Sequence, residues 1–456
     1  MIYWTSLKSM EGQKRNKKVC VLGAGISGIC QALAREEQGD DVTVYEKHSQ
    51  VGGVLQSKII QGYLLDYGAN TLSLRSKKLK KLFEKFHILE QAIDADHNCS
   101  KRFIVRNSKI IALPTGFFSF LNSPFLSFQG KLRLLIEPFI RPKNFKDETM
   151  ASFIERRLGK EVLEYAANPF VGGVYASKPE SLLLKHAFPS LLELEQKYGS
   201  LFKGMIKGGI NRDEKLPKSR LISFPGGMQE LPILFAKHLA RKPVLNSRIT
   251  TVLKENNGRW RVFGETSEKE KIEEVFDEII STLPSHCLTE IEWKSVTDVH
   301  LISDLAQASS PPLALTFLGY SREQIRHPLD GFGFLVPEVE KRNILGTLFS
   351  STLFRNRAPK DKTLLTSFIG GERNPELFDL TDDEILSLSI SENQELLGIQ
   401  GKPEFSHLAR WPNSIPLPDQ STTMRLDAAK VLTKRNAGLV FSGSHILGAP
   451  LPNCIT

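Results

Sequence analysis

The sequence predicts an α/β fold in which a nucleotide-binding domain of parallel strands is assembled from separate parts of the chain. Glycine turns near the start and at residues 437–444 carry this prediction, because each follows an apolar run typical of a buried parallel strand. The length of 456 residues leaves room for two or three domains. Hydrophobic residues make up 41% and charged residues 24%, as in folded proteins, and no run reaches the ~20 apolar residues of a membrane-spanning helix.

The first glycine turn has the G-x-G-x-x-G spacing of a dinucleotide site. Gly23 permits the tight turn, Gly25 lets the backbone approach a pyrophosphate, and Gly28 lets the helix pack closely on the strand. A second apolar strand, residues 41–45, ends at Glu46, whose carboxylate can accept hydrogen bonds from ribose hydroxyls. The predicted cofactor contacts in this part of the chain are Gly23, Ala24, Gly25, Ile26, Ser27, Gly28, Glu46 and Lys47.

A second glycine pair favours FAD over NAD as the dinucleotide. It permits another close approach of the backbone to the cofactor. The run VGGVLQS…LLDYGAN that contains it resembles the FAD-binding segment of the glutathione-reductase-like, amine-oxidase-type flavoproteins. Val54 stands where many members carry Arg, so one phosphate contact is expected to be missing. The predicted contacts in this segment are Gly52, Gly53, Val54, Gly68, Ala69 and Asn70.

The middle of the chain has a different character. Residues 117–140 are rich in Phe and Leu with basic residues among them. This pattern is typical of an amphipathic element that lies in a membrane interface or lines a channel mouth, or else of ordinary core helices. Strand patterns over residues 244–262 and 275–282 then return to the style of the nucleotide-binding region. We therefore expect that domain to be discontinuous.

Motifs over nearly the whole chain from Lys17 resemble those of the protoporphyrinogen oxidases, an FAD-dependent family. Examples are KRFIV at 101–105, NPFVGGVYASKPESL at 168–182, FPGGMQELP at 224–232 and SGSHILGAPLPNCI at 442–455. The resemblance implies a discontinuous Rossmann domain for FAD, a helical membrane-associated domain that forms a substrate channel, and a substrate-binding domain with a mixed sheet. Their expected ranges are 17–85, 215–290 and 425–456 for the first, 98–210 for the second, and 291–424 for the third.

The resemblance also implies roles for single residues. Arg102 is the expected propionate-binding residue; the alternative is a surface arginine paired with an acid such as Glu372. The Gly173 backbone is expected against the tetrapyrrole. The apolar residues expected to sandwich the macrocycle, each of which would otherwise be typical of a core, are Leu335, Leu348 and Phe368. The remaining expected FAD contacts are Ile249, Gly443, Gly448, Asn453, Cys454 and Ile455.

Departures from the family pattern concern the end of the chain. Asn453 replaces the usual Asp, which keeps an acceptor but loses a charge. Family members continue into a closing helix, whereas this chain stops at Thr456. We therefore expect the helix start that faces the pyrophosphate to be absent and flavin affinity to be reduced. Pro418 stands where the family often has Tyr.

The implied activity is the oxygen-dependent, six-electron oxidation of protoporphyrinogen IX to protoporphyrin IX in heme biosynthesis. A different substrate, coproporphyrinogen III, carries four carboxylates and would be favoured by extra basic residues at the cavity mouth. The sequence is also compatible with an amine oxidase or desaturase, and with a flavin-binding protein without activity. The implied partners are the porphyrinogen, molecular oxygen, a membrane surface and the next enzyme of the heme pathway, and a homodimer is left open. The expected location is cytoplasmic, including a peripheral position on the cytoplasmic face of the inner membrane.

Composition argues against several other classes. The five cysteines are scattered without a C-x-x-C pair, which suits a reducing compartment and excludes a disulfide framework or zinc ribbon. The histidines are isolated, so neither a metal site nor a nucleophile–base pair is expected. The net charge of +9 suits an anionic ligand or lipid surface, while nucleic-acid binding lacks the expected mixture of basic and aromatic residues. Residues 1–18 predict a solvated basic tail, with a transit peptide as the weaker alternative.

Overall fold

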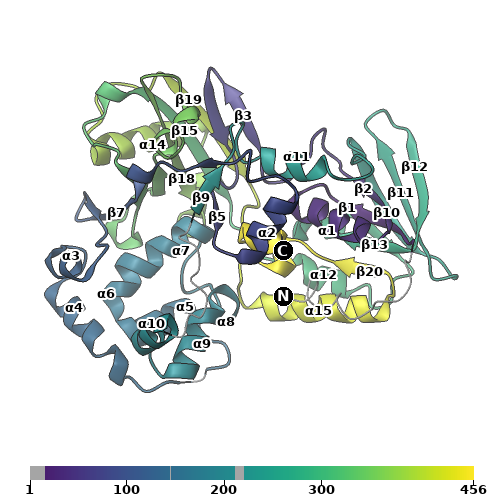
Figure 1. Ribbon diagram of the computed structural model, residues 1–456, viewed down its shortest axis with the longest axis horizontal. Helices are drawn as coiled ribbons and strands as arrows, with labels where there is room; N and C mark the ends of the chain where they lie inside the picture. The colour runs from purple at the N-terminus through teal and green to yellow at the C-terminus, as the bar shows by residue number, and fades with distance from the viewer. Residues whose placement is uncertain (1–15, 144, 211–219, 456) are drawn as a thin grey trace.

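The computed structural model describes residues 16–143, 145–210 and 220–455. Figure 1 shows an α/β region on the right, a second sheet at the upper left, and a group of helices at the lower left. Residues 1–15, which form most of the predicted basic tail, lie outside the described residues.

A parallel sheet joins strands from the start, middle and end of the chain. Within the described residues its strand order is β2 (Asp41–Tyr45), β1 (Lys18–Leu22), β13 (Glu278–Ser281) and β20 (Leu439–Phe441). Every pairing in this sheet is parallel. The strands are almost wholly buried, as expected for a parallel sheet covered on both faces. Helix α1 (Ile26–Glu36) follows β1 directly, which is the strand–turn–helix unit that the glycine spacing predicts.

An antiparallel sheet lies beside the parallel one. Its order in the described chain is β12 (Lys271–Phe276), β11 (Trp260–Thr266), β10 (Ser247–Lys254) and β14 (Glu292–Lys294), with β14 alone pairing in parallel. The predicted hairpin is therefore present as β10 and β11. Val244 links the sheets, because its amide donates to Val44 at 2.8 Å and its carbonyl accepts from Glu46 at 3.0 Å. Helices α12 (Leu301–Ala306) and α15 (Ser421–Arg435) complete this region.

A larger mixed sheet forms the upper left of Figure 1. Among the described residues its order is β19 (Phe405–Trp411), β15 (Leu313–Ser321), β18 (Lys362–Gly370), β17 (Ile344–Leu348), β16 (Gly331–Leu335), β7 (Lys101–Arg106) and β8 (Lys109–Ala112). Residues 101–112 therefore belong to the mixed sheet, whereas the sequence predicted them in the helical domain of residues 98–210. The reason is that β7 pairs in parallel with β16, a strand more than 200 residues later in the chain, as in the pair Lys101–Gly331.

Short strands connect these regions. The chain forms a hairpin of β3 (Ser57–Ile60) and β4 (Tyr63–Asp66), and a small sheet in the order β5 (Leu72–Leu74), β9 (Arg220–Ser223), β6 (Ile93–Asp94). The predicted basic helical connection is α2 (Lys77–Lys85). Because β9 lies between β5 and β6, it brings Arg220 close to Asp94 although the two are far apart in sequence.

Helices dominate residues 117–210. They are α3 (Phe117–Asn122), α4 (Phe128–Leu135), η3 (Glu137–Phe139), α5 (Met150–Leu158), α6 (Lys160–Val162), η4 (Leu163–Ala167), α7 (Asn168–Tyr175), α8 (Leu184–Ala187), α9 (Pro189–Tyr198) and α10 (Leu201–Ile210).

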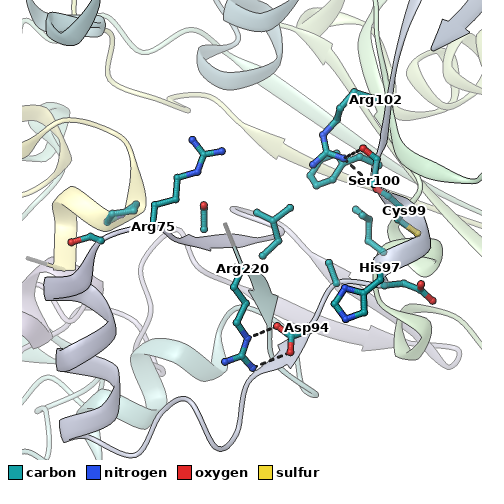
Figure 2. Close-up of a pocket in the computed structure, with 15 residues that line it drawn as sticks. Arg75, Asp94, His97, Cys99, Ser100, Arg102 and Arg220 are labelled. Atoms are coloured by element: carbon teal, nitrogen blue, oxygen red, sulfur yellow. Dashed lines mark hydrogen bonds and ion pairs between the residues drawn. The ribbon is translucent and has the colours of Figure 1, made fainter. Parts of the chain in front are cut away.

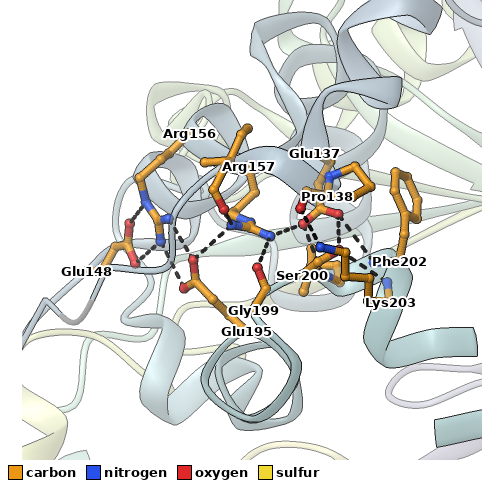
Figure 3. Close-up of polar contacts among 12 residues, drawn as sticks. Glu137, Pro138, Glu148, Arg156, Arg157, Glu195, Gly199, Ser200, Phe202 and Lys203 are labelled. Carbon is orange, nitrogen blue, oxygen red and sulfur yellow. Dashed lines mark hydrogen bonds and ion pairs between the residues drawn. The ribbon is translucent and has the colours of Figure 1, made fainter. Parts of the chain in front are cut away.

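A buried network of ion pairs holds these helices together (Figure 3). Arg157, which is fully buried, donates to the Glu137 carboxylate and to the Gly199 carbonyl at 3.0 Å. Burial raises the pKa of Glu137, but hydrogen bonds from Ser200, the Leu201 amide and Arg157 outweigh it and lower that pKa. Arg156 bridges Glu148 and Glu195. Since a buried charge without its partner is costly, the network fixes the turn at Glu137 against the helices behind it.

Candidate active site

Two pairs of glycines face each other at the carboxyl ends of β1 and β2. Gly25 and Gly52 form a parallel bridge, and the Gly52 amide donates to Ala24 at 2.9 Å. A Cβ on Gly53 would lie 3.2 Å from Gly25 Cα, and one on Gly28 would lie 2.0 Å from the Gly23 carbonyl oxygen. Glycine is therefore needed for the close packing of these two turns, which together form a cradle of backbone groups beside the start of α1.

Glu46 is fixed at the end of β2. Its carboxylate accepts hydrogen bonds from the Ala24 amide at 2.8 Å and the His48 amide at 2.9 Å, and the side chain is buried. These bonds hold Glu46 against the first glycine turn. A carboxylate oxygen has two lone pairs, so this geometry leaves acceptor capacity for ribose hydroxyls.

The cradle opens into a cavity of about 440 Å³. The predicted cofactor residues that line it are Gly23, Gly25, Ile26, Ser27, Glu46, Lys47, Gly52, Gly53, Val54, Ile249 and Cys454. The predicted cofactor residues that do not line it are Ala24, Gly28, Gly68, Ala69, Asn70, Gly443, Gly448, Asn453 and Ile455. Ala24 and Gly28 lie packed beneath the turn, and a Cβ on Gly68 would lie 2.2 Å from the Val54 carbonyl oxygen, so these positions shape the wall from behind.

Several wall residues were missed in the sequence. The segment Thr282–Leu283–Pro284 lines the cavity where β13 ends, and Trp411 lines it where β19 ends. The sequence does offer a reason to expect residues 282–284 at the site. They directly follow a buried parallel strand, and the carboxyl ends of such strands meet at one edge of the sheet, where ligands bind.

His445 was also missed as a wall residue. It lines the cavity, is 4% exposed, and neither of its ring nitrogens has a hydrogen-bond partner among the described residues. Burial, followed by the charges of Arg425 and His286, lowers the pKa of His445 to about 4. Its imidazole is therefore neutral near pH 7, and a buried polar ring without a partner implies an interaction that the polypeptide does not supply.

The predicted absence of a helix start at the end of the chain is wrong, while the expected reduction of flavin affinity stays a prediction. Helix α17 (Leu451–Ile455) begins soon after Gly448, whose φ of +92° provides the sharp turn that precedes it. Cys454 and Ile455 are buried in the core that also contains residues of α1. Helix α17 could not be predicted from the sequence alone, because it is short and is stabilised by the packing of its last residues in this core.

A second cavity, of about 580 Å³, contains the predicted substrate residue Arg102 (Figure 2). Arg102 donates to the carbonyls of Cys99, Ser100 and Lys101 at 3.2–3.4 Å, and its guanidinium lies 4.2 Å from the centroid of the Phe332 ring. Burial lowers the pKa of Arg102. Among the residues that the structure describes, the hydrogen-bond partners of Arg102 are carbonyl oxygens, and no carboxylate forms an ion pair with it.

The alternative pairing of Arg102 with Glu372 is not present. Glu372 instead accepts hydrogen bonds from the Ser177 hydroxyl and from the Lys178 amide at 3.2 Å. The two cavities are adjacent, because Pro452 of α17 lines the Arg102 cavity while Cys454 of the same helix lines the glycine cavity.

The three predicted apolar substrate residues share one face of the mixed sheet. Leu335 and Phe368 both lie opposite Gly346, and Leu348 is two residues further along β17. All three side chains are partly buried. Gly173 of α7 lies against this face, where an added Cβ would be 2.5 Å from Leu335 Cδ2. None of these four residues lines the Arg102 cavity, so the structure groups them with one another but not with Arg102.

Comparison with known proteins decides the family. The model for the flavin containing amine oxidoreductases matches residues 26–455. The chain belongs to the flavin containing amine oxidoreductases. It is 33% identical to protoporphyrinogen oxidase 2 of Arabidopsis thaliana, over 94% of this chain and 90% of that protein. It is also 25% identical to coproporphyrinogen III oxidase of Staphylococcus aureus, over 96% of this chain and 97% of that protein.

Solved structures agree on the fold of this flavoenzyme. A provisionally assigned protoporphyrinogen oxidase from Exiguobacterium sp. 255-15 aligns with a TM-score of 0.80 at 20% identity, covering 97% of this chain and 96% of that chain. Reduced UDP-galactopyranose mutase aligns with a TM-score of 0.72 at 14% identity, covering 96% and 90%. These structures confirm the predicted α/β fold with mixed sheets. The family match and the 33% identical relative confirm the FAD cofactor and the oxidoreductase class.

The residues of the first cavity fit FAD. The paired glycine turns would hold the pyrophosphate, and Glu46 would hold the adenosine ribose, because these are the groups that such turns and acids bind in dinucleotide folds. The unpartnered imidazole of His445 is consistent with a polar ligand in the same cavity.

The cradle predicts different effects for two glycine substitutions. In Gly25→Ala the new methyl group would meet only Gly53 Cα at 3.9 Å, so the fold is retained but the methyl group enters the cradle. We expect the Kd for FAD, measured by fluorescence quenching of added flavin, to rise at least about tenfold. In Gly28→Ala the methyl group would lie 2.0 Å from a carbonyl oxygen, so we expect a lower Tm without added flavin. An unchanged Kd for Gly25→Ala would contradict the assignment.

The buried imidazole predicts a pH dependence of stability. The folded-state pKa of His445 is about 4, below the ~6.5 of an unfolded chain, so the unfolded state binds the proton first as the pH falls. The free energy of unfolding should therefore decrease from about pH 6.5 to about pH 4 by up to about 3 kcal/mol from this group. Denaturant titrations of flavin-free protein at several pH values should show that the free energy of unfolding decreases less steeply with falling pH in His445→Gln than in the parent. The same pH dependence in both proteins would contradict the assignment of this effect to His445.

Proposed function

We propose that this flavoenzyme oxidises a porphyrinogen, with protoporphyrinogen IX as the substrate and molecular oxygen as the final electron acceptor. The observation that carries the proposal is the position of the Arg102 cavity, which adjoins the flavin cavity across the short helix α17. The named similarity to protoporphyrinogen oxidases over 94% of the chain supports this substrate.

Arg102 would bind one propionate of the substrate. The three carbonyls and the Phe332 ring hold the guanidinium in a fixed orientation, and a planar guanidinium can donate two parallel hydrogen bonds to a carboxylate. The apolar face formed by Leu335, Leu348 and Phe368 would accommodate the macrocycle, and Gly173 keeps α7 close to it. When bound, FAD supplies the acceptor for the hydride that the substrate loses.

Substitution of Arg102 tests the proposal. Arg102→Ala should raise KM for protoporphyrinogen IX by about tenfold or more, because a charged hydrogen bond contributes roughly 1.5–3 kcal/mol, while kcat changes little. Formation of fluorescent porphyrin is the measurement. Arg435→Ala is the matched control, because Arg435 is exposed at the end of α15 and lines neither cavity. A parent protein that binds FAD but forms no porphyrin would refute the proposal itself.

Coproporphyrinogen III is the second candidate substrate, favoured by one observation. Arg75 and Arg220 line the same cavity as Arg102, and basic residues at this place would favour a substrate with four carboxylates, but Asp94 and Asp96 line the cavity as well. The similarity to coproporphyrinogen III oxidases is consistent with it, although at lower identity.

We also propose that residues 117–140 bind the surface of an anionic membrane, with the protein on the cytoplasmic face. Four large side chains of this segment point to solvent: Phe118 (80% exposed), Phe128 (75%), Leu135 (67%) and Phe139 (82%). Arg141 and Lys143 follow them and are exposed, and apolar side chains beside basic ones are typical of interfacial elements. Within residues 16–143, 145–210 and 220–455, no helix meets the length and hydropathy needed to cross a bilayer. The homodimer and the contact with the next pathway enzyme stay predictions from sequence.

Vesicle binding tests this membrane proposal. The triple variant Phe118→Ser, Phe128→Ser, Phe139→Ser should lose most of its co-sedimentation with phosphatidylglycerol-containing vesicles. The reason is that each substitution removes a ring whose transfer out of water contributes roughly 1.5–3 kcal/mol. Ile59→Ser, which removes an exposed apolar side chain of β3 outside this segment, is the control. Equal sedimentation of the triple variant and the parent would contradict the proposal.

A further inference from the structure

The Arg102 cavity contains an ion pair that the proposed oxidation does not use. Asp94 of β6 and Arg220 of β9 both line it, and the Arg220 guanidinium donates to both oxygens of the Asp94 carboxylate, with one bond of 3.0 Å. Figure 2 shows this pair below Arg102, with its two bonds drawn as dashed lines.

We propose that Asp94 is a specificity-determining residue, which selects a porphyrinogen with two carboxylates over one with four by neutralising Arg220. The inference rests on the proposed function, because it concerns which porphyrinogen the same cavity accepts.

The charges around the cavity support this role. A substrate carboxylate is attracted to Arg102, which has no acidic partner among the described residues. Arg220 is different, because Asp94 occupies its hydrogen-bonding edge and adds a negative charge next to it. A carboxylate arriving at that wall would be repelled by Asp94 and would find the guanidinium already bound. The second acid on the wall, Asp96, accepts from Arg355 at 3.0 Å.

The Asp94–Arg220 ion pair is not needed for the stability of the fold. Its side chains are 41% and 42% exposed, and ion pairs of that exposure contribute little to folding. The strands that carry the pair are held by their backbones, since β6 pairs with β9 and the Ala95 amide donates to the Leu221 carbonyl at 2.9 Å. A charge can therefore be removed at residue 94 without loss of the strand pairing.

Asp94→Asn tests the proposal, because asparagine keeps the shape and one acceptor but removes the charge. Steady-state formation of porphyrin is measured with protoporphyrinogen IX and coproporphyrinogen III in parallel. We expect the ratio of kcat/KM for coproporphyrinogen III to that for protoporphyrinogen IX to rise about tenfold, through KM. Arg220→Ala in the Asp94→Asn background should return the ratio to the parental value, which a purely structural role for Asp94 would not do.

Asp41→Asn is the matched control, because it removes the acid of the similarly exposed pair Arg241–Asp41 outside this cavity. The inference would be overturned if the kcat/KM ratio of Asp94→Asn lay within twofold of the parental ratio. It would also be overturned if the increased ratio persisted in the double variant that lacks Arg220. If the parent oxidises neither porphyrinogen, the proposed function fails instead. The two failures are therefore distinguishable in one experiment.

Discussion

A buried ion pair between Asp66 and Arg357 joins the flavin-binding part of the chain to the mixed-sheet part. The side chains are 3% and 2% exposed, and the closest N–O distance is 3.0 Å. Asp66 also accepts from the Ser57 hydroxyl and the Met228 amide, while Arg357 donates to Ser223 and the Phe224 carbonyl. Neither charge can be buried without the other. The hairpin that follows the second glycine pair is thereby fixed relative to β9, the strand that also carries Arg220.

A second polar cluster fixes the helices relative to the mixed sheet. Arg373, in the turn after β18, donates to the Val336 carbonyl at 2.6 Å and to the Asn168 side chain at 2.9 Å. Asn168 in turn donates to Glu338 at 2.9 Å. Burial lowers the pKa of Arg373 to about 10, so it stays charged near pH 7. Because Asn168 begins α7, these bonds set the distance at which Gly173 meets Leu335, and a rigid approach of this kind is what a flat substrate requires.

The sequence was most informative where function depends on local backbone geometry. The spacing of Gly23, Gly25 and Gly28 predicts a turn whose contacts lie within a few residues, and the structure has that turn. Features made by long-range pairing were not predictable. His445 lacks a hydrogen-bond partner only because distant elements bury it, and the pairing of β7 with β16 depends on strands that no local pattern connects. The same applies to Asp94 and Arg220, which β9 brings together between two other strands.

The position of α17 links these observations to catalysis. This helix is a shared wall, with Pro452 toward the Arg102 cavity and Cys454 toward the flavin cavity, and its last residues are buried in the same core as α1. Hydride transfer requires donor and acceptor at near van der Waals distance in a site that excludes water. Under the proposed function, a substrate whose propionate is bound at Arg102 would therefore have to extend its macrocycle past α17, because a helix is about 10 Å across, to reach a flavin held by the glycine cradle. Since α1 begins at the glycine cradle and packs in the same core as α17, the two helices fix the position of the flavin cavity relative to the Arg102 cavity.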